Sequence, residues 1–293
     1  MENDFNVADT LSALNLASLP TMPMVALRVH KMLEDEDVAI AKLVHVIQSD
    51  PAVVARMVKM ANSSFYGSRR EIRTIPDAIM TIGLSALRGT VLQAALQELY
   101  QPFGPTEIML WEHANAVAMA ARFLASHLRP ALAEEAFLAG LLHDIGMLVL
   151  NWTAPEKFSL VLTHEELDSE ANFAADEFEV FRVSHGEVGG WVLRNWEFPE
   201  ELISVAKDHH NFLELAADRG ASPGQPSPAW LTTLVSLADV ICLKAGIGYQ
   251  RNEVAAWENL PHLSLLGLDA HRIDQLSNEF LEKYVEEWQY MVS

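Results

Sequence analysis

The stretch FLAGLLHDIGMLVL, residues 137–150, decides how the chain folds and where its chemistry is expected. Its apolar residues recur with helical spacing, so we expect a helix over about residues 134–150 that carries the pair His143-Asp144. No Lys or Arg lies one helical turn from Asp144. A carboxylate in such an apolar helix must be paired or ligated, because leaving it bare in the interior costs several kcal/mol.

The rest of the sequence also has helical rather than strand periodicity, which predicts an all-α fold. Asp50-Pro51 supplies a cap followed by proline at the first helical position, and Thr74 begins another helix. Gly83 is expected to break that second helix into two. SHGE, residues 184–187, has capping-box spacing and predicts a further helix start. Other helices are expected at about residues 106–128, 199–210, 230–243 and 270–291.

Two stretches rich in Pro and Gly mark connections between these helices. QPFGP, residues 101–105, is the best internal boundary, so we expect an N-terminal helical subdomain at 1–104 and a second helical domain at 105–293. DRGASPGQPSP, residues 218–228, predicts a flexible loop. The amphipathic C-terminal segment is expected either to dock on its own domain or to form a homodimer.

The composition is that of an acidic globular protein. The 293 residues include 40 Asp and Glu against 20 Lys and Arg, for a formal net charge of −20. This charge repels a phosphate backbone and an anionic membrane surface, which disfavours nucleic acid and membrane as partners. The N-terminus lacks the pattern of a signal peptide, and we see no apolar run of the ~18 residues that a membrane span needs. We therefore expect a soluble, cytoplasmic protein.

Several further histidines and a second aspartate resemble His143-Asp144 in their setting. Asp239 lies in the apolar run LTTLVSLADVICL, and His113 shares a helix face with small apolar residues. Either a divalent metal or protonated histidines would neutralise the two buried carboxylates. Imidazoles with carboxylates suit iron, manganese, zinc or nickel, which can bind a phosphate oxygen and activate water. The full candidate set is His113, His143, Asp144, His185, His209, His210 and Asp239.

The order and context of these residues resemble the HD superfamily of metal-dependent phosphohydrolases. The N-terminal half sharpens the resemblance to the HDOD family of bacterial signalling modules, which is related to the HD-GYP phosphodiesterases. The segments that carry it are LPTMPMVALRVHKML, IQSDPAVVARMVKMANSSFYG, TIPDAIMTIGLSALRGTVLQAAL, LWEHANAVAMAARFLA, EEAFLAGLLHDIGMLVL and HGEVGGWVLRNWEFPEELISVAKDHH, in the family's order. The similarity covers about residues 16–211, and Asp239 matches the superfamily's final aspartate.

The resemblance implies an all-α fold in which an N-terminal helical subdomain packs on an HD-like domain. It also implies a metal centre of one or two ions. A first ion would be held by His113, His143, Asp144 and Asp239. A second would be held by His185 with His209, His210 or both, with Asp144 bridging the two ions.

Two departures from the catalytic relatives bear on activity. The HD-GYP pattern has a lysine after HDIG where this chain has Met147, and no GYP motif follows the paired histidines. Loss of a phosphate-binding cation weakens electrostatic stabilisation of a substrate. We therefore expect a signal-transduction module that binds a protein partner and holds a metal centre. The alternative is a metal-dependent phosphohydrolase acting on a phosphoester or cyclic nucleotide, which the complete ligand set favours.

Two charged segments outside the ligand set have open interpretations. Arg69, Arg70 and Arg73 form either an anion or acidic-partner site or a solvated loop. The acidic stretch EELDSEANFAADEFE, residues 165–179, is interpreted as a solvated face or lid beside the proposed site.

Overall fold

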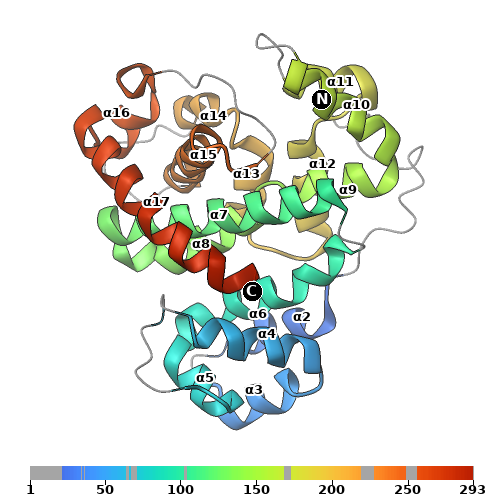
Figure 1. Cartoon of the computed structure of the whole chain (residues 1–293), viewed down its shortest axis with the longest axis vertical. Coiled ribbons are helices and arrows are strands. Elements are labelled where there is room, and N and C mark those ends of the chain that lie inside the picture. Colours follow the sequence, from blue (N-terminus) through green and yellow to red (C-terminus); the bar gives the residue numbers. More distant parts are fainter. Residues whose placement is uncertain are drawn as a thin grey trace. The chain divides into compact units, whose positions relative to one another are not determined.

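The structure is a computed structural model that describes residues 22–33, 35, 37–63, 66, 71–101, 104–167, 173–218, 228–248 and 256–292 (Figure 1). Over these residues it consists of helices, turns and bends with no β-strand, which confirms the all-α prediction. The described residues form two compact units, one of residues 22–101 with 281–292 and one of residues 104–280. Most of the loop expected at 218–228 lies outside the described residues.

The first unit contains five α-helices in the part that the structure describes, and its helix ends follow from local sequence chemistry. At the start of α4 (Pro51–Ala61), the Asp50 carboxylate accepts hydrogen bonds from the backbone N–H groups of Ala52 and Val53, at 3.0 and 3.1 Å. These bonds satisfy donors that have no partner within the helix. The other helices are α2 (Met24–Met32), α3 (Ile40–Ile47), α5 (Ile75–Ile82) and α6 (Leu84–Leu96), with a 3-10 turn at Gln97–Tyr100.

Gly83 separates α5 from α6, as the sequence predicts. Its φ of +82° is one that side chains with a Cβ rarely adopt, and the chain direction changes there by 118°. At the start of α5, the Thr74 side chain accepts a hydrogen bond from the Asp77 N–H, which confirms the expected cap.

The second unit surrounds a core in which α7 (Pro105–Leu128) packs against α8 (Ala133–Leu142) and α15 (Pro228–Lys244), as Figure 1 shows. A second set of contacts joins α12 (His185–Asn195) to α9 (Ile145–Thr153) and α13 (Glu200–Asp208). The remaining helices are α10 (Pro155–Leu167), α11 (Phe173–Phe181), α14 (Phe212–Asp218), α16 (His262–Leu266) and α17 (Ala270–Val292), which continues into the first unit.

The single helix expected over residues 134–150 is wrong in one respect that matters for the site. The chain leaves the helix at His143 and Asp144, so that α8 ends at Leu142 and α9 begins at Ile145. In a continuous helix, consecutive side chains diverge by about 100°. The break, where Asp144 has φ −105° and ψ 19°, allows these two neighbours to turn toward one another.

The region Pro130–Thr153 is long and apolar enough to pass for a membrane span, contrary to our expectation that no such run exists. The apolar residues of α8 and α9 join across His143 and Asp144 to give this length. In the structure, 89% of the most apolar window is buried, as in the core helices of a folded domain. The break at residues 143–144 interrupts it further.

Candidate metal centre

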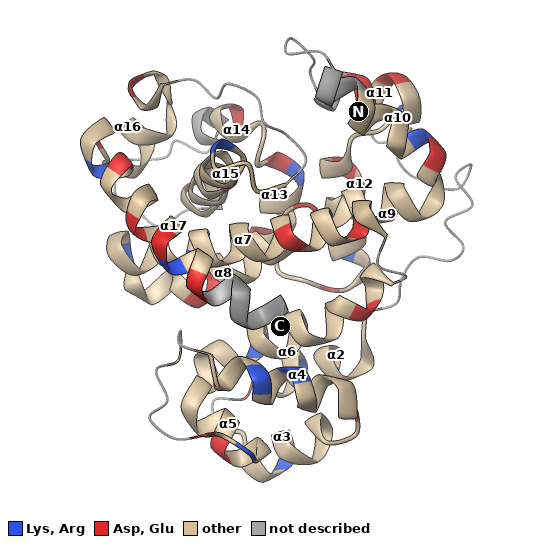
Figure 2. Ribbon diagram, in the orientation of Figure 1, with Lys and Arg blue, Asp and Glu red and all other residues tan. Residues whose placement is uncertain are grey.

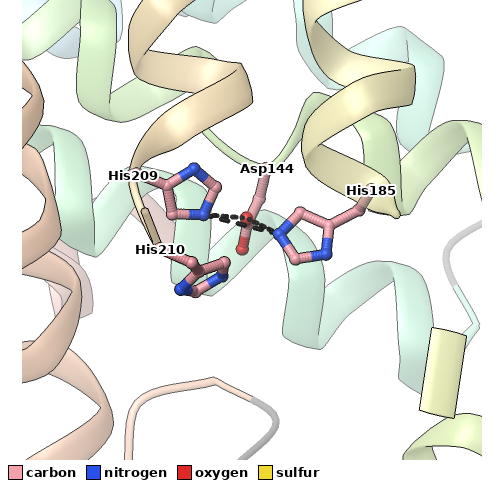
Figure 3. A group of neighbouring side chains, drawn as sticks. All are labelled: Asp144, His185, His209 and His210. Atoms are coloured by element: carbon pink, nitrogen blue, oxygen red, sulfur yellow. Dashed lines mark hydrogen bonds and ion pairs between the residues drawn. The ribbon is translucent and has the colours of Figure 1, made fainter. Parts of the chain in front are cut away.

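The break between α8 and α9 lies where five parts of the second unit meet. His113 comes from α7, His185 is the first residue of α12, and Asp239 belongs to α15. His209 and His210 follow the end of α13 at Asp208. All seven candidate ligands therefore come together, in two groups. One group is His113, His143 and Asp239, and the other is Asp144, His185, His209 and His210 (Figure 3).

The first group is wholly buried and faces one oxygen of Asp144. His113 Nε2 lies 3.1 Å from Asp239 Oδ1 and 3.5 Å from Asp144 Oδ2. His143 Nε2 lies 3.2 Å from the same Asp144 Oδ2. Two imidazole nitrogens and two carboxylate oxygens thus converge, which is the number and type of donors in a four-coordinate metal site.

The second group faces the other oxygen of Asp144, as the dashed lines in Figure 3 show. Asp144 Oδ1 lies 3.5 Å from His185 Nε2 and 3.3 Å from His209 Nε2, and these two nitrogens lie 3.4 Å apart. A point equidistant from the three atoms is about 2.0 Å from each, within the roughly 2.0–2.2 Å of Zn–N and Zn–O bonds. The His210 ring lies 4.0 Å from that of His209, and His210 is exposed.

The other ring nitrogen of each buried histidine is already used. Backbone carbonyl oxygens accept hydrogen bonds from Nδ1 of His113, His143 and His209, at distances of 2.7–3.1 Å. Because a carbonyl oxygen only accepts, Nδ1 must carry the proton, and Nε2 of the neutral ring then offers a lone pair. The carbonyls belong to Ile247, Gly140 and Val205 respectively, and that of Ala206 also accepts from His209.

Several of the converging atoms lack hydrogen bonds although they are buried. His143 Nε2, both carboxylate oxygens of Asp144 and Asp239 Oδ1 form none in the described part of the chain. Burial opposes ionisation of Asp144, but the neighbouring His143, His209 and His185 outweigh it and hold its pKa well below the usual range. Protons on these rings thus balance the carboxylate in metal-free protein. A divalent cation that replaced them would meet an ionised carboxylate and Nε2 lone pairs directed at the same two oxygens.

His185 holds its proton firmly. Burial lowers the pKa of His185, but the charge and hydrogen bond of Glu177, together with the charge of Asp144, raise it to about 9. The pKa of His209 is instead lowered, first by burial, although contact with Asp144 opposes the shift. A metal ion would therefore displace a proton from His185 but would meet His209 already neutral.

Close helix packing positions the ligands, and it depends on a glycine in the HDIG segment. A Cβ placed on Gly146 would lie 1.9 Å from the carbonyl oxygen of His185 and 2.8 Å from the amide nitrogen of Gly189. Real Cβ atoms essentially never approach within 3.0 Å, so only glycine allows α9 to pack this closely on the start of α12. Ser184 and Glu187 form the predicted capping box there, which fixes His185 as the first helical residue.

Glu177 is a site residue that the sequence interpretation missed. Acidic residues lie on α7, α10, α11, α13 and α17 (red in Figure 2), and we expected all those in 165–179 to be a solvated face or lid. That interpretation is wrong for Glu177, which is fully buried and hydrogen-bonds His185. Its spacing of four residues before the buried Phe181 places it on the apolar face of α11, a signal that could have identified it. Residues 168–172 lie outside the described residues.

A second missed contribution comes from the chain after α15. Gly248 has φ +114°, and a Cβ there would lie 2.5 Å from Nδ1 of His113. Glycine thus lets the backbone come close enough for the Ile247 carbonyl to bond this ring. The two residues are 134 positions apart in the sequence, so no local pattern predicts their contact.

Of the three arginines considered for anion or partner contact, only Arg73 is described by the structure. It belongs to the first unit, its side chain is largely exposed, and it forms an ion pair with Glu71. Arg69 and Arg70 lie outside the described residues. An anion or partner contact at these arginines stays a prediction.

Comparison with known proteins agrees with the all-α fold. The HDOD domain matches residues 19–212. A solved HDOD domain protein of unknown function from Geobacter sulfurreducens is 28% identical, with 97% of this chain and 99% of that one covered and a TM-score of 0.79. A candidate signal-transduction protein from Marinobacter aquaeolei, 22% identical with a TM-score of 0.76 and coverages of 98% and 66%, shares the fold.

One curated relative, an uncharacterised protein of Treponema pallidum, is 26% identical over 196 residues, which are 66% of this chain. The match spans only 38% of that relative's length. The family match covers most of the chain and both sides of the His143-Asp144 break. The chain belongs to the HDOD domain family.

Proposed function

We propose that this chain is a bacterial signal-transduction module that holds a divalent transition-metal centre and binds a protein partner. The observation that supports it best is the convergence of buried Nε2 lone pairs on both oxygens of Asp144. One ion would be held by His113, His143 and Asp239, a second by His185, His209 and His210, with Asp144 shared between them.

The donor set suits iron, manganese, zinc or nickel, as imidazole and carboxylate ligands do in general. When bound, such an ion supplies a Lewis acid for a phosphate oxygen and a water that is nucleophilic near neutral pH. The protein's own residues fix the geometry around it. The carbonyl of Gly140 orients His143, and Glu177 orients His185.

Met147 supports a module rather than an enzyme. It lies in the first turn of α9, three residues after Asp144, and its side chain is completely buried. An uncharged thioether at this place supplies no cation for a phosphate group, so substrate binding would lack an electrostatic contribution that a lysine gives.

A metal-dependent phosphohydrolase is the second candidate, and the exposure of His210 favours it. An exposed ligand opens one side of the second group to solvent, as catalytic metal sites require and closed structural sites do not. The substrate would then be a phosphoester or a cyclic nucleotide.

Metal analysis combined with hydrolysis assays distinguishes these functions. Protein purified without chelator is measured for transition metals by mass spectrometry, beside the Asp144→Ala variant. The module proposal predicts bound metal in the wild type, loss of it in the variant, and no turnover of phosphomonoesters or phosphodiesters. Turnover that disappears with Asp144→Ala would replace the module by the phosphohydrolase. Wild-type protein that takes up no metal after reconstitution would exclude the metal centre.

A further inference from the structure

Glu177 joins α11 to the second group of candidate ligands. Its Oε2 accepts hydrogen bonds from the backbone N–H of His185, at 2.8 Å, and from Nδ1 of the same residue, at 2.7 Å. One carboxylate therefore sets the rotation of the ring and supports the helix start that the capping box of Ser184 and Glu187 also fixes. That carboxylate comes from another helix, α11, whose described side chains begin at Asp176.

His185 differs in this respect from the other buried histidines of the centre. Nδ1 of His143 bonds the carbonyl of Gly140, and Nδ1 of His209 bonds those of Val205 and Ala206. These acceptors belong to the helical turn that precedes each histidine, so the rings stay oriented as long as that turn exists. The orientation of His185 depends instead on a tertiary contact, because Glu177 is eight residues away on a separate helix.

The contact is obligatory for both partners when α11 is docked. Glu177 is completely buried, and its Oε1 has no hydrogen bond in the described part of the chain. His185 thus provides the hydrogen bonds that hold Glu177 in the interior. If the His185 ring turned away while α11 stayed docked, the Glu177 carboxylate would remain inside the protein without compensation, which is strongly destabilising. A docked α11 and an oriented His185 should therefore occur together.

We propose, on the basis of the proposed metal centre, that Glu177 is a positioning residue that makes one of two metal positions conditional on the docking of α11. The conditional position is the one at Asp144, His185, His209 and His210. The position at His113, His143 and Asp239 shares Asp144 with it, but the rings of His113 and His143 are oriented by the carbonyls of Ile247 and Gly140 rather than by Glu177.

The coupling acts in both directions. If docking of α11 raises the affinity of the conditional position, then an ion at that position must stabilise docking by the same factor. An ion at the conditional position therefore increases the fraction of molecules in which α11 is docked. This helix carries the exposed Phe178 beside Glu177.

The test measures metal stoichiometry rather than activity. Chelator-treated full-length protein is titrated with Zn²⁺ in a calorimeter, as the wild type, Glu177→Ala, Glu177→Gln and the control Glu179→Gln. Glu179 lies on the same helix but is exposed. We expect two ions in the wild type and the control. Glu177→Ala should bind one ion unchanged and the other about 10–100-fold more weakly, as loss of an outer-shell partner usually does. Glu177→Gln should fall between, because its amide oxygen still accepts from Nδ1.

Two ions bound to Glu177→Ala with wild-type affinities would overturn the inference. A single ion in the wild type would also overturn it while leaving a metal centre in place, whereas no ion would remove the proposed function itself. If Glu177→Ala does not fold, amide hydrogen exchange of the wild type tests the coupling between Zn²⁺ binding and the docking of α11. Exchange in residues 173–181 should slow when the second equivalent of Zn²⁺ binds, and exchange that is indifferent to it would refute the coupling.

Discussion

Adding one methyl group at Gly146 tests how closely two helices must approach for the centre to form. The Cβ of Gly146→Ala would collide with the carbonyl oxygen of His185 at 1.9 Å and with the amide nitrogen of Gly189 at 2.8 Å. Both are backbone atoms, so neither can rotate away as the end of a side chain would. The only relief is separation of α9 from the start of α12.

The size of that separation follows from the contact distances. To reach the 3.0 Å below which real Cβ atoms are essentially never found, the helices must move apart by about 1 Å, from 1.9 Å. Overpacking of this kind costs about 1–3 kcal/mol, and collision with backbone places Gly146→Ala near the upper end. Asp144 lies two residues before Gly146, so the same movement carries His185 away from Asp144. Zn²⁺ affinity at the conditional position should therefore fall about 10–100-fold.

Urea unfolding with chelator present measures the first effect, and Zn²⁺ titration of the folded variant measures the second. Gly189→Ala is the matched control on the facing helix, because its Cβ would make only ordinary contacts, the nearest at 3.4 Å. This control should be neutral or gain up to about 1 kcal/mol from the higher helix propensity of alanine. A Gly146→Ala variant with wild-type stability and wild-type Zn²⁺ affinity would refute the packing argument.

Three further perturbations separate the centre from the rest of the fold. Burial lowers the pKa of His185, but Glu177 and Asp144 raise it to about 9, so Zn²⁺ affinity in dye competition should increase from about pH 6.5 to pH 9. In metal-free protein the same shift stabilises the fold by on the order of 3 kcal/mol below pH 6.5, and urea unfolding should lose this as pH rises through about 9. Asp50→Ala should cost about 1 kcal/mol in unfolding without changing metal content. His210→Ala should weaken Zn²⁺ binding in calorimetry and cost less stability in urea than His209→Ala, because residue 210 is exposed whereas His209 is buried.

Structural features that depend on contacts between neighbouring residues could be predicted from the sequence. The cap at Asp50, the break at Gly83 and the capping box at Ser184 each depend on contacts within four residues, and the structure confirms all three. The candidate ligands could be chosen for a related reason. Histidines and aspartates on apolar helices need partners, and that need is visible without knowing where the helices lie.

What the sequence could not supply depends on contacts between distant segments. The break at His143-Asp144 interrupts a run whose apolar pattern favours one helix, and tertiary packing of α9 on α12 overrides that local preference. Glu177 was hidden by its acidic neighbours, because charge density predicts exposure. Its helical spacing from Phe181 places it on the apolar face, but the partner that compensates its charge, His185, is not visible in the local sequence. The contact of the Ile247 carbonyl with His113 could not be predicted, because every residue has a backbone carbonyl and the two residues are far apart in the sequence.

The most direct test of the metal centre is anomalous diffraction from crystals of the Zn²⁺-loaded protein, recorded on both sides of the zinc absorption edge. We predict anomalous peaks within bonding distance of both oxygens of Asp144, one beside His113 and His143 and the other beside His185 and His209. Peaks confined to other parts of the protein, with Asp144 free of metal, would contradict it.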